Sequence, residues 1–197
     1  MNTDGVDKGR RRVLVAATSV VGAIGAGFVA VPFISAMNPS AKARAAGAPV
    51  QADVSKLEPG GLLRVKWRGQ PIWLVNRTDA MLEALPTLDL KLTDPASELP
   101  QQPEYCQNAT RSINPTYFVA IGICTHLGCS PTYRPEVAPD DLGADWKGGW
   151  FCPCHGSKFD LAGRVYKGVP APSNLVIPKH TYLNETTILI GADEGAA

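Results

Sequence analysis

Two short segments, residues 124–129 and 152–157, hold four of the five cysteines and two of the three histidines in the chain. They read Cys-Thr-His-Leu-Gly-Cys and Cys-Pro-Cys-His-Gly-Ser. Each offers one cysteine and one histidine at ligand spacing: Cys124 and His126 in the first, Cys152 and His155 in the second. Each also has one further cysteine, Cys129 or Cys154. Sulfur and imidazole ligands gathered in two short segments predict a metal site.

Two kinds of metal centre fit this set of ligands. Tetrahedral zinc takes four ligands of these types, whereas a Rieske 2Fe–2S centre takes two cysteines on one iron and two histidines on the other. One cysteine–histidine pair in each segment favours the iron–sulfur centre, because zinc fingers more often pair two cysteines with a separate pair of histidines. The two remaining cysteines also favour it, since they can form a disulfide between the segments.

The two segments, with the proline-rich run 168–172 after them, resemble the Rieske subunit of a bacterial ubiquinol–cytochrome c oxidoreductase, the cytochrome bc complex. The resemblance covers the N-terminal anchor and the domain from about residue 50 onward. It implies one Rieske-type 2Fe–2S cluster, with the ligands Cys124 and Cys152 on one iron and His126 and His155 on the other. It also implies a disulfide between Cys129 and Cys154.

The resemblance assigns roles to side chains around the cluster. His155 would form a hydrogen bond to the quinol, and His126 would also face solvent. Ser157 would donate a hydrogen bond to the cluster and raise its reduction potential, and Leu127 would shield it. The run 168–172 resembles a loop that covers the other side of the cluster, but its pattern is equally that of an ordinary turn.

Phe159 departs from the family pattern. Mitochondrial members place a tyrosine two residues after the serine of the second segment, and its hydroxyl donates a hydrogen bond to a cysteine sulfur. Phenylalanine cannot donate this bond. We therefore expect a lower reduction potential here than in relatives that carry tyrosine.

The resemblance also implies the reaction and the partners. The chain would accept one electron, with a coupled proton, from ubiquinol at the cytochrome b subunit. Movement of the head domain would carry the electron to a c-type cytochrome haem, in a respiratory or photosynthetic chain. The chain would thus be a subunit of a proton-translocating quinol–cytochrome c reductase, within a dimeric complex. A net charge of +1 and the lack of a basic stripe give no indication of nucleic-acid binding.

The N-terminal segment predicts a membrane anchor. Residues 1–12 are polar and end in three arginines, and residues 13–37 are apolar and long enough to span a bilayer as a helix. By the positive-inside rule the arginines place the N-terminus in the cytoplasm of a bacterial inner membrane and the rest in the periplasm. The arginine pair resembles a twin-arginine export signal. A cleaved signal peptide is the alternative, but the apolar run is longer than usual for one.

The remainder predicts a linker and one mainly β domain. Residues 38–50, rich in Ala, Gly and Pro, are expected to form a flexible hinge linker. Residues 51–197 are expected to form an antiparallel β-sandwich with a small cluster-binding subdomain at about 122–172. We expect a hairpin at 62–76 and a short helix from Thr78 to Leu85. Further expected strands run over 117–123, 149–151, 164–166, 175–177, 180–183 and 187–190.

Two chemically active residues lie outside the two segments. Cys106 is predicted to be a free, partly buried thiol, since it is the odd cysteine and lies outside both segments; a redox role is the alternative. His180 has no ligand-spaced neighbour either, and we interpret it as a surface residue of a strand.

Three other functions fit part of the pattern. A small Rieske subunit of another periplasmic oxidoreductase, such as arsenite oxidase, would share the cluster, but those subunits are mostly soluble. An oxygenase-type Rieske domain or ferredoxin would lack the extra cysteines and the anchor. A zinc-stabilised structural domain would need neither a disulfide nor iron.

Overall fold

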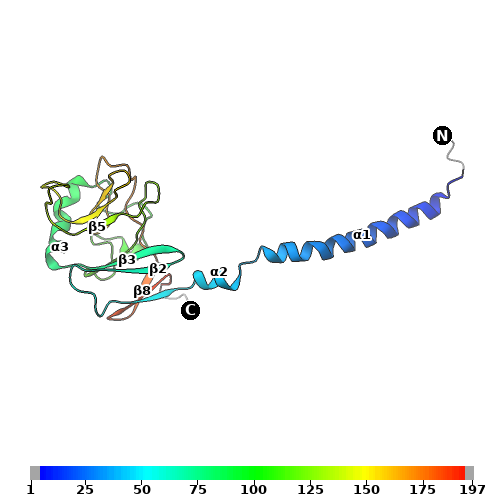
Figure 1. The fold of residues 1–197 in the computed structure, drawn as a ribbon, viewed down its shortest axis with the longest axis horizontal. Coiled ribbons are helices and arrows are strands. Elements are labelled where there is room, and N and C mark those ends of the chain that lie inside the picture. Colours follow the sequence, from blue (N-terminus) through cyan, green and yellow to red (C-terminus); the bar gives the residue numbers. More distant parts are fainter. Residues whose placement is uncertain (1–4, 194–197) are drawn as a thin grey trace. The chain divides into compact units, whose positions relative to one another are not determined.

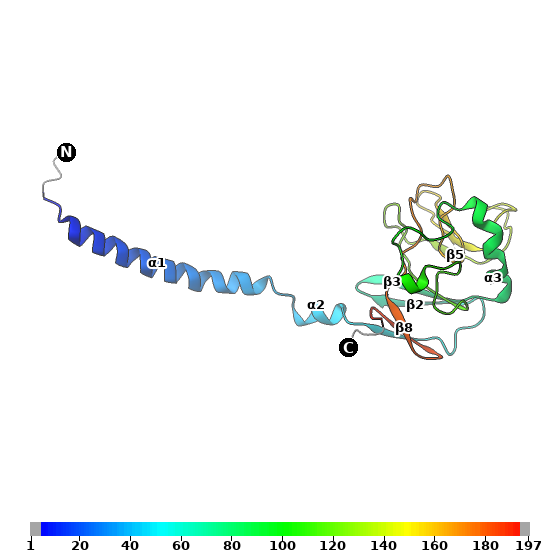
Figure 2. The ribbon, with the colours of Figure 1, turned by 180° about the vertical axis from the view of Figure 1, so that it is seen from behind.

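The structure, a computed structural model, describes residues 5–193 and comprises two units that divide after Ala45 (Figures 1 and 2). In the first unit, α1 (Lys8–Ala36) contains the apolar run. The Asp7 carboxylate caps it, accepting hydrogen bonds from the backbone N–H groups of Gly9 (2.9 Å) and Arg10 (3.1 Å). The helix is long and apolar enough to span a membrane.

The segment expected to be a linker contains a short helix, α2 (Ala41–Ala46). Its sequence, Ala-Lys-Ala-Arg-Ala-Ala, consists of strong helix formers, and the Ser40 hydroxyl accepts a hydrogen bond from the Ala43 N–H (3.1 Å). Composition alone therefore underestimated the helical content of this segment.

The described part of the second unit is mainly β, as expected. Its strands are β1 (Val50–Asp53), β2 (Leu62–Trp67), β3 (Gln70–Asn76), β4 (Tyr117–Ile121), β5 (Thr132–Arg134), β6 (Gly149–Phe151), β7 (Lys158–Phe159), β8 (His180–Asn184) and β9 (Thr187–Ile190). They pair antiparallel in three sheets with the orders β1-β9-β8, β2-β3-β4 and β5-β6-β7. The sheets and helix α3 (Asp79–Ala84), which Thr78 caps, are visible in Figures 1 and 2. Two 3-10 helices, Leu85–Lys91 and Glu104–Cys106, lie in the connection to β4.

The predicted hairpin is confirmed as β2–β3, with register Leu62↔Val75 to Trp67↔Gln70. Arg68 and Gly69 form its turn, and both have positive φ angles, of 50° and 78°. Positive φ at both central residues matches the right-handed twist of paired strands.

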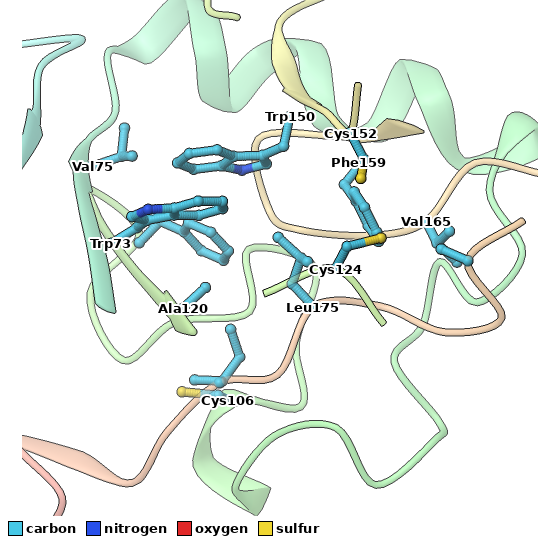
Figure 3. Packing of buried hydrophobic residues seen from close by; sticks show 13 residues of the cluster. Trp73, Val75, Cys106, Ala120, Cys124, Trp150, Cys152, Phe159, Val165 and Leu175 are labelled. Atoms are coloured by element: carbon cyan, nitrogen blue, oxygen red, sulfur yellow. The ribbon is translucent and has the colours of Figure 1, made fainter. Parts of the chain in front are cut away.

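The central strand of the sheet β2-β3-β4 is buried on both faces, because alternate residues of β3 enter different cores. Ile72 and Leu74 pack with side chains of β1 and β9. Trp73 and Val75 enter the other core, which also contains Cys124, Cys152 and Phe159 (Figure 3). In that core the indoles of Trp73 and Trp150 stack, with centroids 4.0 Å apart and planes 6° apart. The sheet therefore connects a sandwich on one side with the cysteine-bearing loops on the other.

Two expected strands do not form ladders. Residues 175–177 hydrogen-bond to three separate segments: Leu175 N–H to Gly163 O, Ile121 N–H to Val176 O, and Ile177 N–H to Gln101 O, each at 2.8 Å. Residues 164–166 make only isolated bridges to Leu92 and Phe159. Each segment lies between several others, so no single neighbour can pair with it along its length.

His180 begins β8, but the expectation that it lies on the surface is wrong: it is 1% exposed. Its Nδ1 lies 2.8 Å from the Pro178 carbonyl oxygen, and the Tyr105 hydroxyl bridges its backbone N–H and C=O groups. Burial lowers the pKa of His180 below its ordinary value of 6.5, and the bond to Pro178 opposes part of this effect.

This lowered pKa predicts a pH dependence of stability. The unfolded chain takes up the proton near pH 6.5, whereas the folded chain takes it up only at lower pH. Below about pH 6.5 the free energy of unfolding is therefore expected to fall, by up to about 1.4 kcal/mol per pH unit from this group. Urea unfolding measured between pH 7.5 and 5.5 should show a smaller fall in the free energy of unfolding for His180→Gln than for the wild type. The glutamine amide can still donate a hydrogen bond to the Pro178 carbonyl but does not titrate. Equal slopes in the two proteins would contradict the prediction.

Candidate metal centre

Strands deliver both cysteine-bearing loops, and the two loops have the same backbone pattern. The first follows β4. The N–H of Cys124 donates to the carbonyl of Cys129 (2.7 Å), and the N–H of Gly128 donates back to the carbonyl of Cys124 (3.1 Å). Gly128 has a φ of 82°, which favours glycine. The loop is thus closed by two bonds across six residues.

The second loop follows β6 and repeats this pattern. The N–H of Cys152 donates to the carbonyl of Ser157 (2.8 Å), and the N–H of Gly156 donates to the carbonyl of Cys152 (2.9 Å). Gly156 has a φ of 77°. The two predicted ligand pairs therefore lie on loops of equivalent geometry.

A disulfide joins the loops, as predicted, between Cys129 and Cys154, whose Cα atoms are 6.6 Å apart. The sulfur atoms of these two residues and of Cys152 lie within 4.8 Å of one another. Since two of the three are in the disulfide, only Cys152 of this group has a thiol to offer a metal.

The free thiols next to the disulfide are those of Cys124 and Cys152, which are 3% and 1% exposed. Burial raises the pKa of the Cys124 thiol. Hydrogen bonding from the His126 N–H and the Ser157 side chain acts in the opposite direction, and the adjacent Cys152 raises the pKa again. On balance the pKa of Cys124 stays raised, so the thiol is the favoured form until a metal ion replaces its proton.

The two histidines of the loops face each other. Their ring centroids are 4.7 Å apart and their planes lie at 89°. The Nδ1 atom of His126 is buried and has no hydrogen-bond partner within residues 5–193. A buried polar atom without a partner is costly, and a metal ion would satisfy it. Two buried thiols and two adjacent imidazoles are the donor set of a Rieske 2Fe–2S cluster, so these side chains fit that group.

The proline-rich run packs against both loops. The N–H of Ala171 donates to the Ser157 hydroxyl oxygen (3.0 Å), so the hydroxyl hydrogen of Ser157 can be directed at the sulfur of Cys124. The Thr125 hydroxyl donates to the Ser173 carbonyl (2.7 Å). No local pattern marks Thr125, because its partner lies 48 residues further along the chain.

Three buried arginines hold the segment that follows the second loop. The bonds run from Arg77 to the Leu161 carbonyl (3.3 Å), from Arg111 to the Ala162 carbonyl (3.1 Å), and from Arg164 to the Asp160 carboxylate (2.7 Å). Burial lowers the pKa of Arg77 and of Arg111 to about 10, so both stay charged at neutral pH. Sequence reasoning missed these residues, since arginine is usually exposed.

The structure places the other predicted residues as follows. Leu127 is 71% exposed and His155 is exposed, so the outer end of the site is open to solvent. Phe159 is fully buried in the core that contains the two free thiols. Cys106 is a buried free cysteine, as predicted, and burial raises its pKa to about 11. Figure 3 shows Cys106 at the opposite side of this core from Cys152.

Comparisons with family models give two matches. The model described as "Rieske [2Fe-2S] domain" matches residues 99–181, which include both loops, and this confirms the predicted cofactor. The model described as "Ubiquitinol-cytochrome C reductase Fe-S subunit TAT signal" matches residues 1–40. Together with α1, it indicates an exported, membrane-anchored protein.

Comparisons with whole proteins agree. The chain is 74% identical to the ubiquinol–cytochrome c reductase iron–sulfur subunit of Allochromatium vinosum over 197 residues, which is 100% of this chain and 95% of the relative. It is 41% identical to the corresponding subunit of Blastochloris viridis, covering 97% of each chain. A chain of a solved hyperthermophilic respiratory Complex III is 24% identical, with a TM-score of 0.49 over 90% of this chain and 98% of that one, which adds nothing to the assignment. Because it is similar to these two relatives over nearly its full length, the chain belongs to the family of Rieske iron–sulfur subunits of ubiquinol–cytochrome c reductase.

Proposed function

We propose that this chain takes one electron and a coupled proton from ubiquinol at a cytochrome b subunit and passes the electron to a c-type haem. As a Rieske subunit of the cytochrome bc complex it is part of an oxidoreductase and transfers electrons. The observation that supports the finer proposal is the pair of adjacent imidazoles at a solvent-open end of a site whose thiols are buried.

Each loop would supply one ligand to each of the two irons. Cys124 and Cys152 would hold one iron as thiolates, and His126 and His155 would hold the other through imidazole nitrogens. When bound, the 2Fe–2S cluster supplies one-electron chemistry, at a potential that two neutral imidazoles raise above that of all-cysteine clusters. The chain's own contribution is to fix the loops, through the disulfide and their backbone bonds.

The exposed end of the site would meet the quinol. His155 is exposed and would accept the hydrogen bond and then the proton of a quinol hydroxyl, while the second imidazole, His126, stays beside it. Leu127, which protrudes between the ligand His126 and the disulfide cysteine, would shield the cluster and offer an apolar contact. Ser157 is fully buried, and its free hydroxyl hydrogen would be donated to the cluster.

The remaining features concern location and partners. We assign residues 1–12 to the cytoplasm, 13–37 to the inner-membrane span, 38–50 to a hinge and 51–197 to a periplasmic Rieske domain. The basic residues before the span, Lys8 and Arg10 to Arg12, support this orientation. Cytochrome b and c-type cytochrome subunits, in a dimeric complex, are the partners that family membership suggests.

Low-temperature EPR of ascorbate-reduced membranes containing the chain tests this function. A rhombic signal with an average g below the free-electron value, shifted by a quinol-site inhibitor, is the expected result. The same signal without a response to the inhibitor would contradict the contact with quinol. An absent signal, with zinc in the purified protein, would overturn electron transfer as well.

The buried Phe159 gives a prediction for the reduction potential. Phe159→Tyr is expected to raise the midpoint potential by about 20–65 mV, the one-electron equivalent of a net hydrogen bond of about 0.5–1.5 kcal/mol. The added hydroxyl would donate to a sulfur of the core in which Phe159 packs with Cys124 and Cys152. Redox titration followed by EPR measures it, with Phe159→Leu as a matched variant that donates no bond and should leave the potential unchanged. An unchanged midpoint in Phe159→Tyr would contradict the explanation.

A further inference from the structure

Trp67, the last residue of β2, is bound to the point where the chain enters the domain. Its indole Nε1–H donates a hydrogen bond of 3.1 Å to the carbonyl oxygen of Ala48. The two residues are 19 positions apart, and Ala48 lies two residues before β1 begins at Val50. The bond therefore belongs neither to the β2–β3 hairpin nor to the pairing of β1 with β9.

The end of β9 leaves space for the indole. A Cβ atom on Gly191 would lie 2.5 Å from Trp67 Nε1, and the φ of Gly191 is +98°, so glycine is required there on both counts. Gly191 is itself fixed, since its N–H donates to the Lys179 carbonyl (2.7 Å). The Arg68 guanidinium lies 4.5 Å from the centroid of the indole ring. Trp67 is thus held in one position against the end of the sheet.

The backbone conformation at Ala48 is restricted, which favours a fixed hydrogen bond. A following proline restricts Ala48 to extended conformations, which fixes the direction of its carbonyl group. Pro49 has no backbone N–H, so this residue cannot donate a hydrogen bond that would hold the chain in a different position. The first strand pair, Val50↔Ile190, comes immediately afterwards. The bond to Trp67 therefore adds a fixed point ahead of the strand.

We propose that Trp67 is a positioning residue that sets where the tether of the Rieske domain ends. We call residues 38–47, between the proposed membrane span and Ala48, the tether. With the Trp67–Ala48 bond formed, the tether ends at Gly47. Without it, Ala48 and Pro49 join the tether and lengthen its reach by about 7 Å. This inference rests on the proposed movement of the domain, because a longer tether lowers the effective concentration of the domain at each docking site.

Hydrogen–deuterium exchange on the full-length, cluster-containing subunit in detergent tests the proposal. In Trp67→Phe the aromatic ring is kept and the N–H is lost. Exchange at the first amides of β1, in Val50–Asp53, is expected to rise about 2- to 10-fold, the range that one net hydrogen bond carries. Exchange in β3 and β4, the EPR signal and the midpoint potential should stay as in the wild type. Arg64→Ala, an exposed residue of the same strand, is the matched control and should change none of these.

Two outcomes would overturn the proposal. One is unchanged exchange in β1 of Trp67→Phe, which would show that the bond does not hold the chain. The other is an equal rise in β1, β3 and β4, which would show that Trp67 stabilises the whole domain rather than the end of the tether. A wild-type protein without a Rieske EPR signal would contradict the proposed function instead, and the exchange comparison would still be readable.

Discussion

Replacing His126 with alanine is expected to abolish the Rieske EPR signal and to reduce quinol–cytochrome c turnover to the level of a complex without this subunit. The Nδ1 atom of His126 is buried and has no hydrogen-bond partner among the described residues. The centroid of its ring lies 4.7 Å from the centroid of the His155 ring. Alanine supplies no ligand, so one iron would lose half of the imidazole pair that distinguishes this cluster from all-cysteine ones. Iron analysis and EPR on the purified subunit measure the loss.

The chain offers a matched control for this experiment. His180→Gln changes the third histidine, which is also buried but is bound to the Pro178 carbonyl. It should keep both iron atoms, the rhombic signal and turnover. A rhombic signal of wild-type intensity in His126→Ala would remove His126 from the ligand set.

Opening the disulfide with Cys154→Ser is expected to lower the stability of the domain by about 3.5 kcal/mol, from the chain entropy of a loop with a sequence separation of 25. For a domain of this size that corresponds to a fall in Tm of about 10 °C. The loops would keep their own backbone bonds, but the only covalent link between them within residues 5–193 would be gone. Thermal unfolding followed by circular dichroism measures the change.

Reductant and a second substitution provide the controls. Reducing agent should lower the Tm of the wild type toward that of Cys154→Ser and leave the variant unchanged. The double variant Cys129→Ser with Cys154→Ser should match the single one, because both remove the same cross-link. A Cys154→Ser protein as stable as the wild type would show that the backbone bonds hold the loops without the disulfide.

Features that depend on neighbouring residues could be predicted from the sequence. The spacing of cysteine and histidine in each loop indicated the iron–sulfur cluster, which the family match confirms, and the family resemblance implied the disulfide, which the structure confirms. Two strand-like runs, 62–67 and 71–76, on either side of a short turn segment located the β2–β3 hairpin, and Thr78 marked the start of α3. The individual cluster ligands remain a prediction, which His126→Ala tests for one of the four.

Features that depend on distant residues could not be predicted. The hydrogen bond from Thr125 to Ser173 spans 48 residues, and that from Arg77 to the Leu161 carbonyl spans 84. Local pattern also placed His180 on the surface, because nothing near it in the sequence shows that Tyr105, 75 residues away, covers its backbone. Residues 175–177 have the composition of a strand, but their three hydrogen bonds go to separate segments.

The closeness of three sulfur atoms constrains the order in which the protein matures. Cys152 lies within 4.8 Å of both sulfurs of the disulfide, and a free thiol at such a disulfide can attack either sulfur and exchange partners. Bound to iron, Cys152 is no longer available as the attacking thiol. A chain that receives its cluster before export, as the twin-arginine signal allows, therefore meets oxidising conditions with a single disulfide pairing open to it. In a chain exported without iron, these three thiols and that of Cys124, which contacts Cys152, would compete, and Cys152 could be consumed in a wrong pairing.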